Sequence, residues 1–355
     1  MRLAILTLIA ALSVTAAEKV VGGPYVVNSS VRSATIAWIV ATGEVSVQAP
    51  GGTAALTSPT LRVEKTTLSG LKPNTKYEYS VGRDAALKGC FKTPPTGDEP
   101  FRFVVYGDNR TRHDIHRRVV DTLMKRGVPD FVLQTGDLVA DGYNDALWPV
   151  FFDIEKELLR QTSFFPALGN HERNTPRFLE FFQTAKPYYS FDWGKAHFIV
   201  LNSDLPNVSH SERERAAFWA EQTRWLEDDL ATHQSAQYRF ISAHHPPFTA
   251  VERRQGDNAH MTALVPMFEK YRVTAAFFGH DHNYQHYLKN GIHYVISGGG
   301  GAPLYDVNSP PANITQRVVS SENFVSVSVD GKNIHVEAIS MNGDVLDSFE
   351  LTPPR

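Results

Sequence analysis

The segment Phe101–Asn109, FRFVVYGDN, sets the pattern for the larger part of the chain. Its apolar residues predict a buried strand, and a glycine then leads directly into a carboxylate and an amide. Glycine lets the backbone turn sharply and approach a ligand closely. The same order returns at Phe131–Asp137, FVLQTGD. A single glycine–aspartate pair marks an ordinary turn, so the argument depends on its repetition.

Five expected strands end in this way, with a glycine or alanine followed by residues that can bind a metal. In layered α/β domains, sites assemble just beyond the carboxyl ends of strands, so we expect the five segments to meet. Carboxylate, amide oxygen and imidazole together suit Zn, Mn or Fe. The five segments are Gly107-Asp108-Asn109, Gly136-Asp137, Gly169-Asn170-His171-Glu172, Ala243-His244-His245 and Gly279-His280-Asp281-His282.

From Phe101 onward, apolar strands alternate with amphipathic helices, which is typical of an α/β or mixed layered domain. The expected helices are His113–Arg126, Asp145–Arg160, Ser211–Thr232 and Met261–Tyr271. The expected strands are Phe101–Tyr106, Phe131–Thr135, Phe164–Leu168, His197–Asn202, Tyr238–Ala243, Thr274–Phe278 and His293–Ser297, with further β structure in 187–193 and 323–351.

Residues 20–93 have a different pattern, of short alternating strands separated by turn residues. Such strands at this spacing predict a small β-sandwich. The proline-rich segment Thr93–Pro100 predicts a linker, because proline and glycine cannot continue a strand. We therefore expect a β-sandwich domain over 18–96 and an α/β domain over 97–355. The strands are Ser33–Val40, Val45–Ala49, Leu61–Leu68 and Thr75–Val81, and the turns are Thr42-Gly43, Pro50-Gly51-Gly52 and Lys72-Pro73-Asn74.

The composition excludes several classes of protein. Of the 355 residues, 42% are hydrophobic and 21% charged, which excludes a disordered or fibrous chain. The 35 basic and 38 acidic residues leave no basic excess for binding nucleic acid. A single cysteine, Cys90, excludes an intramolecular disulfide and a cysteine-based zinc knuckle. Of the 14 histidines, we interpret His197, His233, His293 and His335 as structural.

Residues 1–17 have the features of a secretory signal peptide. Arg2 supplies the positive start, Leu3–Leu12 is apolar apart from Thr7, and Thr15-Ala16-Ala17 supplies small residues before Glu18. This apolar stretch is shorter than the ~20 residues that a membrane span requires, and no later stretch is apolar enough. The sequence therefore predicts a secreted or periplasmic protein without a stable membrane span.

The motif series, taken in order, resembles the calcineurin-like metallophosphoesterases. Leu71–Tyr79 also resembles the turn and tyrosine of a fibronectin type III-like module, a combination similar to the purple acid phosphatases. The resemblance implies a two-sheet β-sandwich flanked by helices, after an N-terminal β-sandwich, with two metal ions at the strand ends. It also implies the ligands: Asp108 and His282 for the first metal, Asp137 as the bridge, and Asn170, His244 and His280 for the second metal.

The chain departs from the family pattern beside the first metal. Purple acid phosphatases have a tyrosine ligand three residues after the bridging aspartate, where this chain has Ala140. In those proteins, a tyrosinate bound to ferric iron gives the purple colour. Other members of the superfamily have a histidine two residues after the first aspartate, where this chain has Arg110, which cannot ligate. The substitutes left open are Asn109, His113, His116, Tyr143 or water.

Three further residues are candidates for catalysis or substrate binding. By position, His171 matches the histidine that contacts phosphate and protonates the leaving group. Arg110 either binds the substrate phosphate or forms a structural ion pair with an acid such as Asp141. His245 either contacts substrate or caps the turn at Pro246-Pro247, while the family pattern favours His244 as the ligand.

These observations predict an exported, binuclear metal-dependent phosphoesterase. Two ions, Fe, Mn or Zn, would neutralise the phosphate and supply hydroxide near neutral pH for attack on phosphomonoesters of small molecules. One alternative is a phosphodiesterase of the same fold, because the metal core serves both reactions. The other is a catalytically weakened cell-surface binding protein that uses its β-domain. The oligomeric state is left open.

Overall fold

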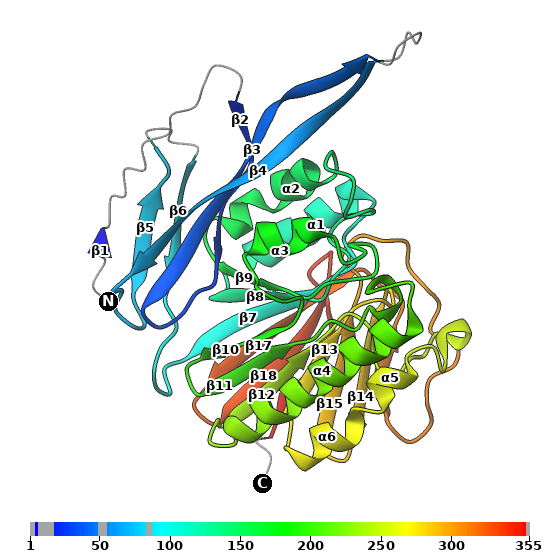
Figure 1. The fold of residues 1–355 in the computed structure, drawn as a ribbon. Helices are drawn as coiled ribbons and strands as arrows, with labels where there is room; N and C mark the ends of the chain where they lie inside the picture. The colour runs from blue at the N-terminus through cyan, green and yellow to red at the C-terminus, as the bar shows by residue number, and fades with distance from the viewer. Residues whose placement is uncertain (1–3, 6–17, 49–54, 83–86, 353–355) are drawn as a thin grey trace.

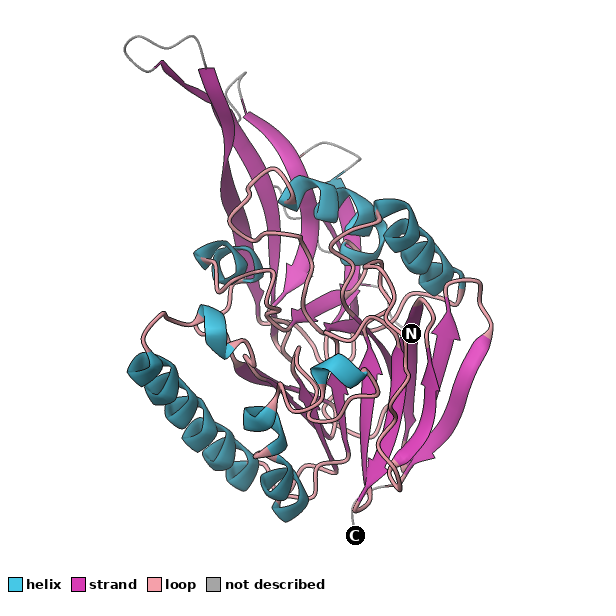
Figure 2. Ribbon diagram, turned by 90° about the vertical axis from the view of Figure 1, so that its right-hand side faces the viewer, coloured by secondary structure: helices cyan, strands magenta, loops and turns pink. Residues whose placement is uncertain are grey.

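The computed structural model describes residues 4–5, 18–48, 55–82 and 87–352. Two large β-sheets form the body of the molecule, and helices cover their outer faces (Figures 1 and 2). This mixed α/β architecture confirms the predicted fold class. Among the described residues, no helix is both long enough and apolar enough to span a bilayer.

The first sheet has nine strands, and its centre is parallel. β7 (Phe101–Tyr106), β8 (Phe131–Gln134) and β9 (Ser163–Pro166) run side by side in one direction. Antiparallel strands extend the sheet on one side, namely β17 (Asn323–Asp330), β18 (Asn333–Ser340) and β19 (Val345–Leu351). On the other side, β9 leads to β2 (Glu18–Val27), β3 (Ser33–Gln48) and β4 (Ala55–Ser69).

The second sheet has seven strands, and four neighbours in it are parallel. In spatial order it contains β10 (Tyr189–Trp193), β11 (Ala196–Val200), β12 (Tyr238–Ser242), β13 (Ala275–Phe278), β15 (Ile292–Ser297), β14 (Tyr284–Lys289) and β16 (Thr315–Val319). Strands β11, β12, β13 and β15 are parallel, so their carboxyl ends lie at one edge.

Aromatic side chains fill the space between the two sheets. Phe103 of the first sheet contacts Phe198 of the second edge-to-face, with ring centroids 5.3 Å apart. Helices α1 (His113–Lys125), α2 (Trp148–Leu159) and α3 (Pro176–Phe182) pack on the outer face of the first sheet. Helices α4 (Glu212–Thr232), α5 (Ala259–Thr262) and α6 (Val265–Lys270) cover the second sheet. These cores fix the strand ends that carry the polar loops.

The N-terminal strands have their own apolar core on one face. Side chains of β2, β3 and β4, including Trp38, pack with those of β5 (Lys76–Ser80) and β6 (Lys88–Lys92). The hydroxyl of Tyr77 accepts a hydrogen bond from the Lys72 backbone N–H at 2.8 Å, which ties the strand to the turn before it. The opposite face of β2–β4 packs against α2 and α3. The division at 96/97 stays a prediction.

Most of the predicted signal peptide lies outside the described residues. Within it, only β1 (Ala4–Ile5) is described, and it pairs in parallel with β5. The prediction of a leader therefore stays a prediction.

Two predictions of secondary structure are wrong, and each has a local cause. The expected turn at Thr42-Gly43 is a β-bulge within the continuous strand β3, whose register against β4 shifts there. The expected helix 261–271 is divided into α5 and α6, because Pro266 at the start of α6 has no N–H to continue the helix. The sequence analysis also missed α3, β2, β6, β14 and β16.

Candidate metal centre

The six predicted ligands lie together at the carboxyl ends of five strands. Asp108 follows β7, Asp137 follows β8 and Asn170 follows β9. From the second sheet, His244 follows β12, while His280 and His282 follow β13. We call these six side chains the donor cluster. The expectation that the five strand ends meet is confirmed, because contacts of 3.5 Å or less connect the cluster from both sheets.

The backbone is strained where it presents these side chains. Asp108, Asp137 and His280 have φ values of 59°, 59° and 69°, in the left-handed region that residues with a Cβ rarely adopt. Gly169 allows the closest approach, because a Cβ there would lie 2.3 Å from Asp137 Oδ1. Such strain persists only where the surrounding structure enforces it, and it concentrates at functional sites.

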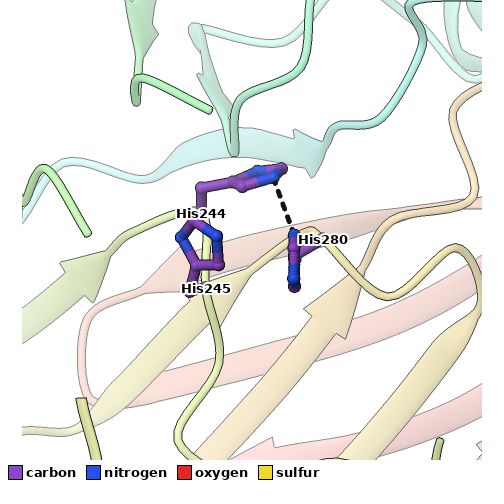
Figure 3. Close-up of side chains that lie close together, drawn as sticks. All are labelled: His244, His245 and His280. Atoms are coloured by element: carbon purple, nitrogen blue, oxygen red, sulfur yellow. Dashed lines mark hydrogen bonds between the residues drawn. The ribbon is translucent and has the colours of Figure 1, made fainter. Parts of the chain in front are cut away.

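One side of the donor cluster brings three side chains into a triangle. Asn170 Oδ1 lies 3.0 Å from His244 Nε2 and 3.1 Å from His280 Nδ1, and the two ring nitrogens are 3.3 Å apart (Figure 3). Asp137 Oδ1 lies 3.4 Å from His244 Nε2. Four metal-competent atoms from four loops therefore lie close together, and we call this group the second site.

The protonation of this triangle favours a cation. His244 donates its Nδ1–H to the Thr135 carbonyl at 2.7 Å, which leaves a lone pair on Nε2 facing the amide oxygen of Asn170. Burial lowers the pKa of His244 and of His280, so both rings are neutral at pH 7. Around a tetrahedral metal ion with bonds of ~2.1 Å, neighbouring ligand atoms lie about 3.4 Å from one another. The distances between the atoms of the second site, 3.0–3.4 Å, are similar. The second site fits a metal ion.

The other side of the cluster has fewer donors. His282 donates Nδ1–H to the Pro303 carbonyl at 2.7 Å, and its Nε2 lies 3.5 Å from Asp108 Oδ1. Among the described residues, that buried oxygen has no hydrogen-bond partner. Burial and the neighbouring Asp137 raise the pKa of Asp108, so its ionised form requires a cation nearby. We call Asp108 and His282, with the Asp137 carboxylate beside them, the first site, and it fits a metal ion less completely.

The candidate fourth ligands are engaged elsewhere or exposed. The amide oxygen of Asn109 accepts from Gln134 at 2.8 Å, and His116 Nε2 lies 2.6 Å from Glu155 Oε1. His113 is exposed at the start of α1, and Tyr143 is 58% exposed. Of the substitutes left open by the sequence, this leaves water.

Arg110 contacts the donor cluster directly. Its Nε donates to Asp137 Oδ2 at 3.2 Å, and its side chain is only 15% exposed. Arg110 therefore forms an ion pair with an acid, as one of the two alternatives expected, but the partner is Asp137 and not Asp141, which pairs with Arg173 at 3.4 Å. Arg110 thus places a positive charge directly on the Asp137 carboxylate, inside the donor cluster.

The two remaining histidines line the same cluster. His171 donates Nδ1–H to the Ala140 carbonyl at 2.7 Å, which leaves its partly exposed Nε2 3.9 Å from Asp137 Oδ2. His245 packs 4.1 Å, centroid to centroid, from His280 (Figure 3). Its Nδ1 lies 2.9 Å from the hydroxyl of Ser203, which also accepts its backbone N–H. That hydroxyl therefore orients the ring.

The sequence analysis gave no role to the residues that hold these loops. The Glu172 carboxylate accepts four backbone N–H groups, from Asp137, Leu138, Val139 and Gly169, at 2.8–3.2 Å. It therefore joins the loop after β8 to the loop after β9. The signal was its place in the segment Gly169–Glu172, where we interpreted it only as metal-competent.

A second set of residues holds the loop that carries His280 and His282. Asp281, between them, accepts from Thr249 and Gln285 and lies 3.6 Å from Arg254 Nε. Arg254 in turn donates to the hydroxyl of Tyr305 at 3.2 Å, and the Tyr305 ring stacks on His282 at 4.0 Å. No motif in the sequence marked Arg254 or Tyr305, because neither residue directly follows one of the five strands that carry the donor cluster.

Comparison with known proteins identifies a matching family and several related proteins. A family described as calcineurin-like phosphoesterase matches residues 101–284. Purple acid phosphatase 21 of Arabidopsis thaliana is 28% identical over 268 residues, covering 68% of this chain and 58% of the relative. A probable inactive purple acid phosphatase 1 of the same plant is 25% identical over 357 residues, covering 80% of this chain and 57% of the relative. The chain thus spans somewhat over half the length of these relatives.

The fold is also known from solved structures. The purple acid phosphatase PPD1 from yellow lupin (Lupinus luteus) seeds superposes with a TM-score of 0.72 at 17% identity, covering 93% of this chain and 74% of that one. The family match spans more than half of the chain and includes the strands and loops that carry the donor cluster. The chain therefore belongs to the calcineurin-like phosphoesterases.

Proposed function

We propose that the protein is a metal-dependent phosphoesterase that hydrolyses phosphomonoesters of small molecules. The observation that carries the proposal is the triangle of Asn170, His244 and His280, whose metal-competent atoms lie 3.0–3.3 Å apart beside the Asp137 carboxylate. Membership of the calcineurin-like phosphoesterases supports the reaction class, and the relatives named as purple acid phosphatases support phosphate esters as substrates.

The donor cluster would hold two metal ions, Fe, Mn or Zn. Asn170, His244 and His280 would bind the second ion, Asp108 and His282 the first, and Asp137 would serve both. When bound, such ions neutralise the phosphate and supply hydroxide near neutral pH. The chain's own part is to keep the imidazoles neutral by burial and to fix the rings of His244 and His282 through the backbone carbonyls of Thr135 and Pro303.

His171 would act as the general acid. Its ring is fixed by the hydrogen bond from Nδ1 to Ala140, Nε2 lies 3.9 Å from Asp137 Oδ2, and the side chain is 31% exposed. From there it can deliver a proton to the oxygen of the departing alcohol. General acid catalysis of this kind contributes ~10²–10⁴ in rate.

Arg110 and His245 would bind the phosphate group. A guanidinium can donate to two phosphate oxygens at once, which suits the dianion of a monoester better than the single charge of a diester. His245 lies against His280, and the hydroxyl of Ser203 holds its ring in place. Both residues would position the substrate over the donor cluster.

A panel of phosphate esters tests the proposal. Metal-free protein is supplied with Mn²⁺, Zn²⁺, Fe²⁺ or Ca²⁺ and assayed with p-nitrophenyl phosphate and bis(p-nitrophenyl) phosphate. The proposal expects turnover of the monoester with a first-row metal, little turnover of the diester, and loss of activity with a chelator. Preference for the diester would favour the phosphodiesterase, and no turnover with any metal would favour a binding protein.

We also propose that the protein is exported. Arg2, the apolar stretch 3–12 and the small residues before Glu18 support a cleaved leader. Cell fractionation with N-terminal sequencing should find mature protein that begins at Glu18 outside the cytoplasm. An uncleaved N-terminus in the cytoplasm would contradict it.

A further inference from the structure

A cavity of about 660 Å³ lies between the loop after β8 and the start of α3. Its volume is in the range of small-molecule binding pockets. Among the described residues, its lining includes no member of the donor cluster, so the proposed reaction has not yet given the cavity a role. The cavity is lined by Asp141, Tyr143, Asn144, Asp145, Thr175, Pro176, Arg177 and Glu180.

One wall of the cavity is built on the segment that holds His171. The Ala140 carbonyl accepts the Nδ1–H of His171 at 2.7 Å, and the Gly142 N–H donates to the His171 backbone carbonyl at 2.9 Å. Asp141 and Tyr143 alternate with these two residues along the chain, and both line the cavity. The cavity therefore begins beside the residue that would act as the general acid.

Tyr143 has the properties of a fixed binding surface in this wall. Its backbone N–H donates to Asp141 Oδ1 at 3.1 Å. The guanidinium of Arg173 lies 5.4 Å from the centre of the Tyr143 ring, and its Nη1 lies 3.4 Å from Asp141 Oδ1. These contacts hold the loop and the ring in place, yet Tyr143 is 58% exposed. Much of the side chain is therefore open to a ligand.

We propose that this cavity binds the alcohol part of the substrate, and that this alcohol carries a hydroxylated ring, as a sugar does. The inference rests on the proposed function and names its substrate class. A general acid must lie within hydrogen-bond distance of the leaving oxygen, so the departing alcohol extends from the Nε2 atom of His171. Tyr143 would lie against the C–H face of the sugar ring, and the polar lining would bind its hydroxyl groups.

The polar groups of the cavity suit hydroxyl groups, which both donate and accept hydrogen bonds. The amide oxygen of Asn144 accepts the Ala146 N–H at 3.1 Å, which leaves its amino group free to donate. Arg177 donates to both oxygens of Asp145, at 3.0 and 2.8 Å, so these two side chains are oriented before a ligand arrives. The carboxylate of Asp141 is 42% exposed and can accept a hydroxyl hydrogen. An alkyl alcohol would use none of these groups.

Two esters with similar leaving-group reactivity test the proposal. Glucose 6-phosphate and hexyl phosphate both release a primary alkoxide with the same number of carbon atoms, but only the sugar carries ring hydroxyls. With Mn²⁺-loaded protein, we expect kcat/KM to be at least about 10-fold higher for glucose 6-phosphate, at the low end of what pocket contacts discriminate. Tyr143→Ala should remove most of this preference through KM, and Tyr143→Phe, which keeps the ring, should retain it. Val345→Ala, at an exposed position of β19, is the control and should behave as the wild type.

Ligand-detected NMR gives a second readout that does not depend on turnover. In the metal-free full chain, saturation of aromatic protein protons should transfer to the ring protons of glucose 6-phosphate, and Tyr143→Ala should abolish the transfer. Adenosine 5′-monophosphate, which offers a ribose, distinguishes a nucleotide from a free sugar phosphate as the source of the hydroxylated ring. Both esters should exceed hexyl phosphate in kcat/KM.

The outcomes separate this inference from the proposed function. Equal kcat/KM for glucose 6-phosphate and hexyl phosphate would overturn the sugar site and leave the phosphoesterase standing. An unchanged preference in folded Tyr143→Ala would also overturn it. Should that variant not fold, the comparison of the esters with the wild type decides alone. Hydrolysis of no ester with any metal would contradict the proposed function instead, and the NMR measurement would still test the cavity.

Discussion

Among the described residues, the donor cluster and a second cluster of histidine and aspartate use their ring nitrogens differently. In the donor cluster, His244 and His282 each give Nδ1–H to a backbone carbonyl and keep Nε2 free. The other cluster, which we call the His197 cluster, contains Asp192, His197, Asp229 and His233. There, the two nitrogens of His197 lie 2.7 Å from Asp192 Oδ1 and 2.7 Å from Asp229 Oδ2.

The partners of each ring decide what it can do. Burial lowers the pKa of the donor-cluster histidines, to about 3 for His282, so they keep a lone pair for a metal. Burial alone would also lower the pKa of His197, but the hydrogen bonds to Asp192 and Asp229 outweigh it and raise the pKa. An imidazolium has no lone pair to offer. The same residue types therefore predict a metal site in the donor cluster. In the His197 cluster they predict ion pairs that connect β10, β11 and α4.

The largest expected effect follows from removing the shared carboxylate. Asp137→Ala should release at least one metal and lower kcat/KM by about 10³-fold or more, beyond the loss of a single transition-state donor. Without that anion, two cations would repel each other. Metal analysis and steady-state kinetics measure both effects. Asp192→Ala, from the His197 cluster, is the matched control and should keep the metal content and the kcat/KM of the wild type. A variant Asp137→Ala with two tightly bound ions and substantial turnover would exclude the bridge.

His171→Ala should keep the metals and lower kcat. For alkyl phosphates, with poor leaving groups, the loss should be ~10²–10⁴-fold. For p-nitrophenyl phosphate it should be much smaller, because nitrophenolate leaves without a proton. His233→Ala, from the His197 cluster, should leave kcat unchanged for both esters. Equal losses for both esters would remove the acid role from His171.

A spectral difference is expected next. Loading with ferric iron should give no strong visible band, because Ala140 stands where the purple proteins have a tyrosine. Tyr143 is 58% exposed, and the hydroxyl of Tyr305 accepts from Arg254. Absorption spectra of the iron-loaded protein measure this. A violet band would mean that a tyrosine has entered the coordination sphere.

The smallest expected effect is on stability in the His197 cluster. Because the folded pKa of His197 is raised, its charged form stabilises the protein fully below the unfolded pKa of about 6.5. That contribution is lost as the pH rises through the folded pKa. His197→Gln should therefore reduce the free energy of unfolding by about 1–3 kcal/mol more at pH 6 than at pH 9. Urea unfolding of the wild type and the variant at pH 6 and pH 9 measures this difference. A loss of stability that does not change with pH would contradict a charged His197.

The sequence predicted the donor cluster well because its information is local. Each ligand follows an apolar strand and a small residue, so neighbouring positions determine where it lies. Glu172 and Arg254 were missed because their roles depend on contacts between separate loops. The geometry of Arg110 was missed for the same reason: Asp137 and Asp141 are both near in sequence, and only the fold selects Asp137.

Some missed elements had signals in the sequence. Asn290-Gly291 joins β14 to β15 with φ of 49° and 81°, the conformation of a tight hairpin turn that this pair favours. Thr175-Pro176 begins α3, where the threonine side chain accepts from the Arg177 N–H and proline occupies the first turn. The division between α5 and α6 could likewise be expected from Pro266.

Anomalous diffraction from crystals grown with Mn²⁺ tests the central claim most directly. The account predicts a peak among Asp137, Asn170, His244 and His280, whose metal-competent atoms lie together. It predicts no peak among Asp192, His197 and His233, although their ligand atoms lie within 4.8 Å of one another. A peak in the His197 cluster, or none in the donor cluster, would contradict it.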